Sequence, residues 1–155
     1  MTTDTPIGSE QSGDSPGETQ VYDGTACSLV SRNEAADAFG YDPGPSEVKD
    51  TTSPGATSCK FGNADPEYVQ WTMTTQGGRD AYFKVYNGAA PGSLEDLTGL
   101  GEAAYGNAKF GSGFYNIGFY KGDSFVVIVF YTTKAVSPKT QALSFAQAAA
   151  DRLTP

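Results

Sequence analysis

Alternating apolar and polar residues predict a β-hairpin in the first half of the chain. The alternation is clearest at 68–74, where Trp71 falls on the apolar face of a strand and Tyr68 falls on the polar face. A second strand is expected at 57–62, and the turn-forming residues 63–66 separate the two runs. This arrangement predicts that the two strands pair with each other.

Three more strands are expected in the second half, at 103–107, 113–121 and 124–133. Gly122 and Asp123 form a two-residue connection of the kind that joins neighbouring antiparallel strands. The last of the three runs is apolar on both of its faces. It is therefore predicted to lie in the middle of the sheet, covered on both sides for much of its length.

Capping signals mark a first helix at 32–39. Ser31 is the predicted N-cap, Glu34 completes a capping box, and Gly40 suits the left-handed residue that ends many helices. Residues 79–87 fit either a strand or a short helix, and the helix is the preferred interpretation.

The final helix has the clearest pattern of apolar residues. Ser137 is its predicted N-cap and Pro138 takes the first helical position. The apolar stripe that follows consists of Leu143, Ala146, Ala150 and Leu153, widened by Ala142, Phe145 and Ala149. Such a stripe predicts a helix packed against a sheet.

These elements together predict one α+β domain over 27–155: an antiparallel sheet of about five strands, with two or three helices packed on one face. Residues 41–56 are expected to form an irregular loop or a weak strand, and the stretch from 91 to Leu97 is expected to form a loop. No internal repeat is found.

Charge is spread unevenly along the chain. The 155 residues carry 10 Lys and Arg against 18 Asp and Glu, a net charge of −8. Residues 1–26 hold five acidic residues, no basic residue, and mostly Ser, Thr, Gly and Pro. Such a segment is expected to be a flexible tether, although it also fits a leader added for expression. The remaining residues carry 13 acidic and 10 basic groups, so the predicted domain is nearly neutral.

Several classes of function are disfavoured by composition. Nucleic acids and anionic membranes bind clusters of Lys and Arg, which an acidic chain without basic runs does not provide. The chain contains no histidine, which removes Ser-His-Asp triads, Cys-His dyads and histidine-ligated metals. We therefore expect no metal, no cofactor and no catalytic activity.

Two cysteines bear on the cellular compartment. Cys27 precedes the first predicted helix and Cys59 lies in the first predicted strand, about 32 residues later. A disulfide between them is the preferred interpretation; two unrelated buried thiols or a metal pair are the alternatives. No apolar run reaches the roughly 18 residues of a membrane helix, and no signal peptide precedes the domain. The chain fits either a cytosolic protein or the mature part of an exported one, and a disulfide favours export.

A resemblance emerges from the order of four motifs. A Cys before a capped helix (27–40), Cys-Lys-Phe at 59–61, Gly-Leu-Gly-Glu-Ala-Ala-Tyr at 99–105 and an alanine-rich final helix resemble a family of small actinobacterial cell-envelope lipoproteins of unknown function. The resemblance covers 27–153. It implies a position at the outer face of the membrane, a disulfide and an α+β fold. The lipid anchor that it implies would lie outside this chain, and no catalytic residue follows from it.

Other candidate chemistry is weak. The glycines at 99–101 lack the remaining residues of a dinucleotide or phosphate loop. Two carboxylate pairs, Glu95 with Asp96 and Asp65 with Glu67, suggest a glycosidase-like site, but solvated loop charges explain them better. Asp42, Asp50 and Asp65 lie in turns rich in Pro and Gly and are candidate calcium ligands, but their spacing fits no EF-hand.

The aromatic residues are the most promising material for a binding site. The chain has nine Tyr and nine Phe, and rings on a sheet face can stack on sugars, lipid tails or peptides. Packing in the core is the alternative role for these rings. The candidate ligand-binding residues are Tyr68, Trp71, Tyr82, Tyr115 and Tyr120.

The sequence thus favours a monomeric, extracytoplasmic binding or interaction module of the bacterial envelope, held to the membrane only by an inferred lipid anchor. Its partner is expected to be an envelope protein, a lipid or a glycan. A carboxylate-dependent hydrolase acting on an envelope glycan is the alternative. The hydrolase requires two acidic side chains within roughly 5–10 Å of each other in a cleft.

Overall fold

The structure is a computed structural model that describes residues 21–50, 56–62, 67–108, 113–133 and 138–153. Within these ranges, no helix has the length and apolar character needed to cross a membrane. The predicted N-cap Ser137 and most of the predicted tether lie outside the described residues.

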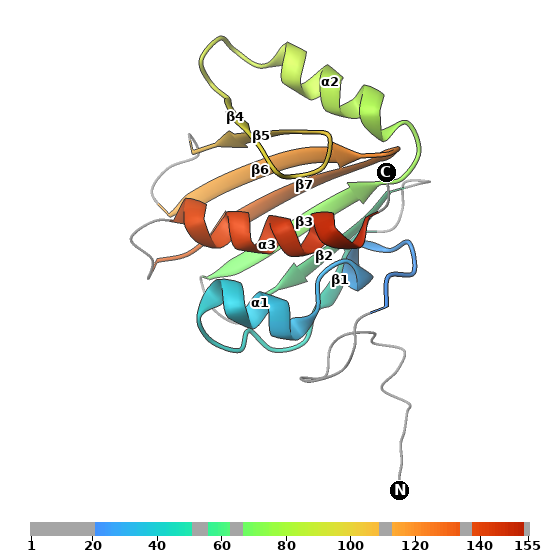
Figure 1. The fold of residues 1–155 in the computed structure, drawn as a ribbon. Helices are drawn as coiled ribbons and strands as arrows, with labels where there is room; N and C mark the ends of the chain where they lie inside the picture. Colours follow the sequence, from blue (N-terminus) through green and yellow to red (C-terminus); the bar gives the residue numbers. More distant parts are fainter. Residues whose placement is uncertain (1–20, 51–55, 63–66, 109–112, 134–137, 154–155) are drawn as a thin grey trace, which may run out of the picture.

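A single antiparallel sheet organises the described part of the chain (Figure 1). Its strand order is β1-β2-β3-β7-β6-β5-β4. The strands are β1 (Glu47–Asp50), β2 (Ala56–Phe61), β3 (Tyr68–Thr74), β4 (Glu95–Leu97), β5 (Ala103–Asn107), β6 (Phe114–Lys121) and β7 (Ser124–Tyr131). The strand predicted to be central, β7, occupies the middle of this order, and β2 pairs with β3 as predicted.

The sheet has seven strands in the described residues, so the prediction of about five was wrong. The two strands beyond that count, β1 and β4, are the short edge strands of the sheet. β1 lies in the segment 41–56, expected to be an irregular loop or a weak strand, and β4 lies in the stretch expected to be a loop. Each pairs through its backbone with one neighbour: Val48 lies opposite Cys59, and Asp96 lies opposite Tyr105. Edge strands of three or four residues with polar side chains leave little hydrophobic alternation, so pattern alone does not reveal them.

In the described part of the chain, the three α-helices form where the sequence predicted them. The first, α1 (Arg32–Phe39), begins with a full capping box between Ser31 and Glu34 and ends at Gly40, whose φ is 85°. Residues Gly78–Gly88 form α2, which confirms the helical interpretation, and Pro138–Arg152 form α3.

The helices cover both faces of the sheet, and this corrects the prediction that they pack on one face. Figure 1 shows α1 and α3 side by side in front of the sheet, with α2 apart from them. On β7, Val126, Ile128 and Phe130 pack into the cluster that includes α1 and α3, whereas Phe125 packs with Tyr82 of α2. A central strand that is apolar on both faces needs cover on both, and α2 supplies the second cover. We call these two sides the α3 face and the α2 face.

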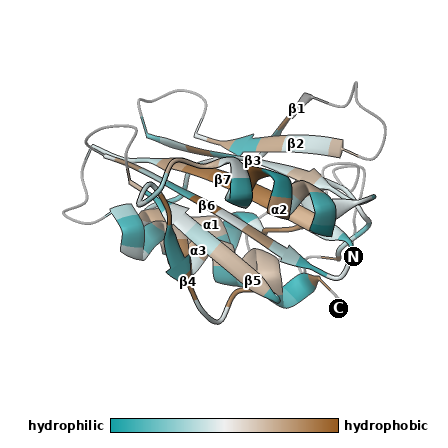
Figure 2. Ribbon diagram, turned by 90° about the horizontal axis from the view of Figure 1, so that it is seen from above, coloured by the Kyte–Doolittle hydropathy of each residue, from teal (hydrophilic) through white to brown (hydrophobic). Residues whose placement is uncertain are grey.

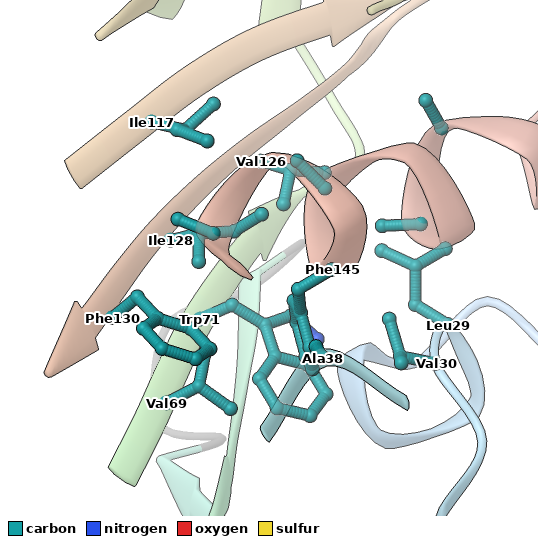
Figure 3. Close-up of a cluster of buried hydrophobic side chains, with 14 of the residues drawn as sticks. Leu29, Val30, Ala38, Val69, Trp71, Ile117, Val126, Ile128, Phe130 and Phe145 are labelled. Carbon is teal, nitrogen blue, oxygen red and sulfur yellow. The ribbon is translucent and has the colours of Figure 1, made fainter. Parts of the chain in front are cut away.

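The main core lies on the α3 face. Figure 3 shows Trp71 and Phe145 at its centre, and their ring centroids are 4.9 Å apart in an edge-on contact. Both side chains are fully buried, and the indole nitrogen of Trp71 donates a 2.8 Å hydrogen bond to the carbonyl of Ala26. The alanines of α3 at 142, 146 and 149 are also fully buried, because small side chains let the helix approach the sheet closely.

A disulfide joins Cys27 to Cys59, as predicted, with the two Cα atoms 5.1 Å apart. It attaches the 3₁₀ turn Ala26–Ser28 to β2. The packed part of the chain reaches back to Tyr22, inside the segment predicted to be a tether, because Tyr22 lies against the main core.

Candidate functional site

The α2 face is covered only in part. Figure 2 views the molecule from the side of α2, which lies over the central strands β6 and β7. Strand register places side chains of this face in rows that run across the strands. Beneath α2 lies a second, smaller core in which Tyr82, Tyr105, Tyr120 and Phe125 are buried.

Three aromatic rings form a row at the end of the α2 face away from this small core. Tyr68 of β3 lies opposite Tyr131 of β7, which in turn lies opposite Phe114 of β6. Ring centroids are 5.8 Å apart for the first pair and 4.4 Å apart for the second. All three rings are only half-buried, so this aromatic row exposes contiguous ring surface to solvent.

The next row, one step along the strands toward α2, has two amide side chains, one on either side of a valine, and we call it the polar row. Gln70, Val129 and Asn116 lie side by side on β3, β7 and β6, and all three are half-buried. Lys60 of β2 lies opposite Gln70, and its ammonium nitrogen sits 4.9 Å from the centroid of the Tyr68 ring. Rows on one face are two residues apart along a strand, roughly 7 Å. The amides are therefore close enough to the aromatic row for one ligand to contact both.

A hollow of about 340 Å³ opens between the C-terminal end of α2 and this polar row. Its lining comprises Val85, Gly88, Ala89, Ser93, Leu94, Tyr105, Asn107, Asn116 and Val127. We call it the α2 pocket. Backbone and side chains of α2 and the following loop make one wall, and the sheet makes the floor.

Asn116, on the floor of the α2 pocket, has an unusual side chain. Among the described residues, two buried side-chain oxygens have no hydrogen-bond partner, those of Asn116 and Gln141, and of the two only Asn116 lines this pocket. A buried acceptor left without a partner costs about 1–3 kcal/mol. Rotation of the half-buried Asn116 amide would present this oxygen to a hydroxyl or N–H group of a ligand in the pocket.

The described lining of the α2 pocket is uncharged, because it contains no acidic or basic side chain. Asp96 of β4 lies on the same face and accepts a 2.7 Å hydrogen bond from the Tyr86 hydroxyl. Under α2, burial, together with neighbouring tyrosines and Asp96, raises the pKa of Tyr82 to about 12. Tyr82 therefore stays uncharged at neutral pH and acts as a packing group.

The structure separates the five predicted binding residues. Tyr68 belongs to the aromatic row and is half-buried. Trp71 and Tyr115 lie on the α3 face and are buried, and the Tyr115 hydroxyl donates a 2.6 Å hydrogen bond to Glu95. Tyr82 and Tyr120 are buried in the small core, with ring centroids 5.0 Å apart. The other four rings are buried in the two cores, where they pack against other side chains. Tyr68 is therefore the only one of the five that we retain as a candidate for ligand contact.

Three residues of the site were not singled out from sequence: Phe114, Tyr131 and Asn116. The alternation of side chains along a strand gives part of the information, because Phe114 and Asn116 alternate with buried residues of β6. The same alternation, which we call parity, places Trp71 and Tyr68 on opposite faces. It does not reveal which of the two faces the helices leave open.

The predicted carboxylate pairs are not arranged as an acid-base pair in the described residues. Glu95 and Asp96 are successive residues of β4, so they point to opposite faces of the sheet, and each accepts a hydrogen bond from a tyrosine. Bonds from Tyr115 and Lys139 hold the pKa of Glu95 below its ordinary value. Glu67, expected to be a solvated loop charge, is instead buried, and it accepts a 2.6 Å hydrogen bond from the backbone N–H of Thr133. Its expected partner Asp65 lies outside the described residues.

Calcium and phosphate sites gain no support. Among the described residues, no three acidic or cysteine side chains come together as metal ligands. Asp42 is bound to Arg32 by two 2.7 Å hydrogen bonds, and the side chains of Asp50 and Asp65 are not described. In the glycine segment, Gly101 has a φ of 61° and packs against the Tyr120 carbonyl, where a Cβ would come within 2.3 Å. A glycine is therefore needed at position 101 because two backbone segments approach each other closely there.

Comparisons of the chain with protein-family models, with curated proteins and with solved structures gave no significant match.

Proposed function

We propose that this protein is a non-catalytic binding module that works outside the cytoplasm, and that its ligand binds on the open part of the α2 face. The observation that carries the proposal is Asn116, which lines the α2 pocket and whose side-chain oxygen has no hydrogen-bond partner among the described residues. Concave sites with apolar walls and a few convergent polar groups are the usual form of ligand pockets.

The proposed location has independent support. The Cys27–Cys59 disulfide is typical of proteins that mature in an oxidising compartment. The order of motifs that resembles actinobacterial envelope lipoproteins agrees with this location. We propose the outer face of a bacterial membrane as the site of action, with a lipid anchor outside this chain holding the domain there.

A carboxylate-dependent hydrolase acting on an envelope glycan is less well supported. No carboxylate is among the described residues that line the α2 pocket, and Glu95 and Asp96 face opposite sides of the sheet. A hydrolase of that type needs two carboxylates on either side of one scissile bond. A second hollow is lined in part by the acidic residues Glu34, Asp37 and Asp151. Glu34 is held there by the capping box and by Arg152. Binding without turnover is therefore the function that the α2 pocket favours.

Native mass spectrometry with three proteins tests the proposal: the wild type, Asn116→Leu and Asn87→Leu. Each is incubated separately with an aqueous and a lipid extract of a bacterial envelope. Asn116→Leu fills the same space without the unpartnered oxygen, so its free energy of unfolding should not fall below that of the wild type. Asn87 is exposed on α2 and does not line the pocket, so it controls for the substitution itself.

We expect the wild type and Asn87→Leu to retain a bound compound that Asn116→Leu loses, with the mass of that compound unchanged over time. Absence of any bound compound on the wild type would count against the proposal. Equal retention by all three proteins would move the site elsewhere. Progressive cleavage of the bound compound would instead support the hydrolase.

A further inference from the structure

We propose that the aromatic row and the α2 pocket together form a binding site for a neutral glycan. This inference rests on the proposed function, because it names the class of ligand that the same face takes. It is argued from three properties of the described part of this face: half-buried aromatic rings, an Asn116 side-chain oxygen without a hydrogen-bond partner, and a pocket lining without charged side chains.

The aromatic row provides a stacking platform. Phe114, Tyr131 and Tyr68 come from three adjacent strands, and neighbouring strands lie roughly 4.8 Å apart, so their rings span about 10 Å of continuous surface. Sugar rings carry apolar C–H groups on one side, which pack well against aromatic faces. The row lies on the face of a sheet, where its rings are held by strand backbones and lose little freedom when a ligand binds.

The polar row supplies hydrogen bonds of the kind that hydroxyl groups need. Amides of Asn116 and Gln70 each offer a carbonyl acceptor and an NH₂ donor, and a sugar hydroxyl is both donor and acceptor. Within the described part of the chain, the buried oxygen of Asn116 has no hydrogen-bond partner. A lipid tail in the α2 pocket would leave this oxygen unsatisfied, whereas a hydroxyl group would pair with it.

Charge narrows the class of ligand further. The chain has a net charge of −8, yet no charged side chain is among the described residues that line the α2 pocket. Lys60 lies at the margin of the face, over the Tyr68 ring and opposite Glu47 of β1, so this margin has one charge of each sign. Apart from this margin, the described residues of the aromatic row and the α2 pocket offer no pairing partner to a phosphate, a uronic acid or a basic peptide.

A peptide partner would need other features. Extended peptides add to the free edge of a sheet, because they bind through unpaired backbone groups. The aromatic row instead lies on β3, β7 and β6, whose backbones are already paired on both sides. The side chains of this face are what a ligand can reach, which again suits stacking and hydroxyl recognition.

The test records amide NMR spectra of the full chain during titration with defined probes. The probes are neutral oligosaccharides of glucose, mannose, galactose and arabinose, an oligogalacturonate of matched length, and neutral phosphatidylcholine vesicles. We expect at least one neutral oligosaccharide to shift the signals of Phe114, Asn116 and Tyr131 selectively. Its affinity should change little between low and high salt, because no ion pair forms.

Four variants then separate stacking from folding. Tyr131→Ala and Phe114→Ala should weaken binding by roughly tenfold each, because each removes one ring of the platform. Tyr131→Phe keeps the ring and should retain most of the affinity. Phe83→Ala removes a half-buried ring from α2 that lies 5.6 Å from Tyr120, away from the aromatic row, and should bind like the wild type. Amide spectra of the free variants show which of them fold.

The outcomes distinguish this inference from the proposed function. A neutral oligosaccharide that binds through another surface, or equally well to Tyr131→Ala, would overturn the glycan site. If vesicles or the oligogalacturonate shift these signals and no neutral sugar does, the ligand is not a neutral glycan, and the proposed binding function still holds. If no probe shifts them and the envelope extracts yield no bound compound, both proposals fail.

Discussion

Reduction of the Cys27–Cys59 disulfide is expected to destabilise the protein while leaving its native structure in place. The bridge is only one of several attachments at that point. Trp71 holds the carbonyl of Ala26, and the N–H of Ala26 donates a 2.8 Å hydrogen bond to the Thr57 hydroxyl. These hydrogen bonds survive reduction, so reduction should lower the free energy of unfolding mainly by giving the denatured chain more conformational freedom.

The expected magnitude follows from the length of the closed loop. The two cysteines are 32 residues apart in sequence. In the chain-entropy treatment, opening a loop of that length lowers the free energy of unfolding by about 3.7 kcal/mol. A domain of this size loses roughly 2 kcal/mol of stability per molar urea, so the unfolding midpoint should fall by roughly 2 M. The urea dependence should also become slightly steeper, because an uncrosslinked denatured chain exposes more surface.

Equilibrium urea unfolding with and without dithiothreitol measures this shift. Intact mass after alkylation should show two thiols only in the reduced sample. The double variant Cys27→Ala/Cys59→Ala serves as the control: its midpoint should match that of the reduced wild type and ignore the reductant. An unchanged wild-type midpoint after verified reduction would refute the entropic reasoning, and free thiols in the untreated protein would remove the main internal argument for export.

Three further predictions concern packing and titration. Gly78→Ala should destabilise by about 1–3 kcal/mol in urea unfolding, because its Cβ would come within 2.2 Å of the Asp123 carbonyl, whereas Gly88→Ala in the same helix meets nothing and should be neutral or slightly stabilising. Because the pKa of Glu95 is lowered in the folded protein, ionised Glu95 adds to the free energy of unfolding above its ordinary pKa of 4.5, and this contribution is lost as pH falls through the lower folded pKa. The thermal unfolding temperatures of Glu95→Gln and wild type should therefore converge in acid. Because the pKa of Tyr82 is raised to about 12, neutral Tyr82 adds to the free energy of unfolding below pH 10, and this contribution is lost as pH rises toward 12. In an ultraviolet titration, Tyr82→Phe should lack one tyrosine that ionises late in the wild type.

Local signals predicted the elements well because their causes are local. The capping box of Ser31 and Glu34, the left-handed Gly40 and the two-residue connection at Gly122 depend on neighbouring residues only, and all of them form. The central position of β7 was also predictable, because a strand that is apolar on both faces has few other stable places in a sheet.

The candidate site was less predictable because it depends on which surfaces the helices leave uncovered. Tyr115 and Phe114 are successive residues of β6, yet one is buried under α3 and the other stays half-exposed. Parity places them on opposite faces but does not say where α2 ends. The position of α2 is fixed by tertiary contacts at its start, where Asp123 accepts hydrogen bonds from the backbone N–H groups of Gly77 and Gly78. That pairing joins residues more than forty positions apart.

The uncovered part of the α2 face is where the fold departs from what stability alone would select. An aliphatic residue at position 116 would remove the unpartnered amide oxygen, and a bulkier cover over the aromatic row would bury its rings. Either change would favour the folded state, since exposed rings and unsatisfied acceptors both cost free energy. Local departures of this kind are expected where a protein serves a ligand. Asn116→Leu makes the argument measurable: a variant that is as stable as the wild type or more so, and that loses its ligand, would show that the amide is there for binding.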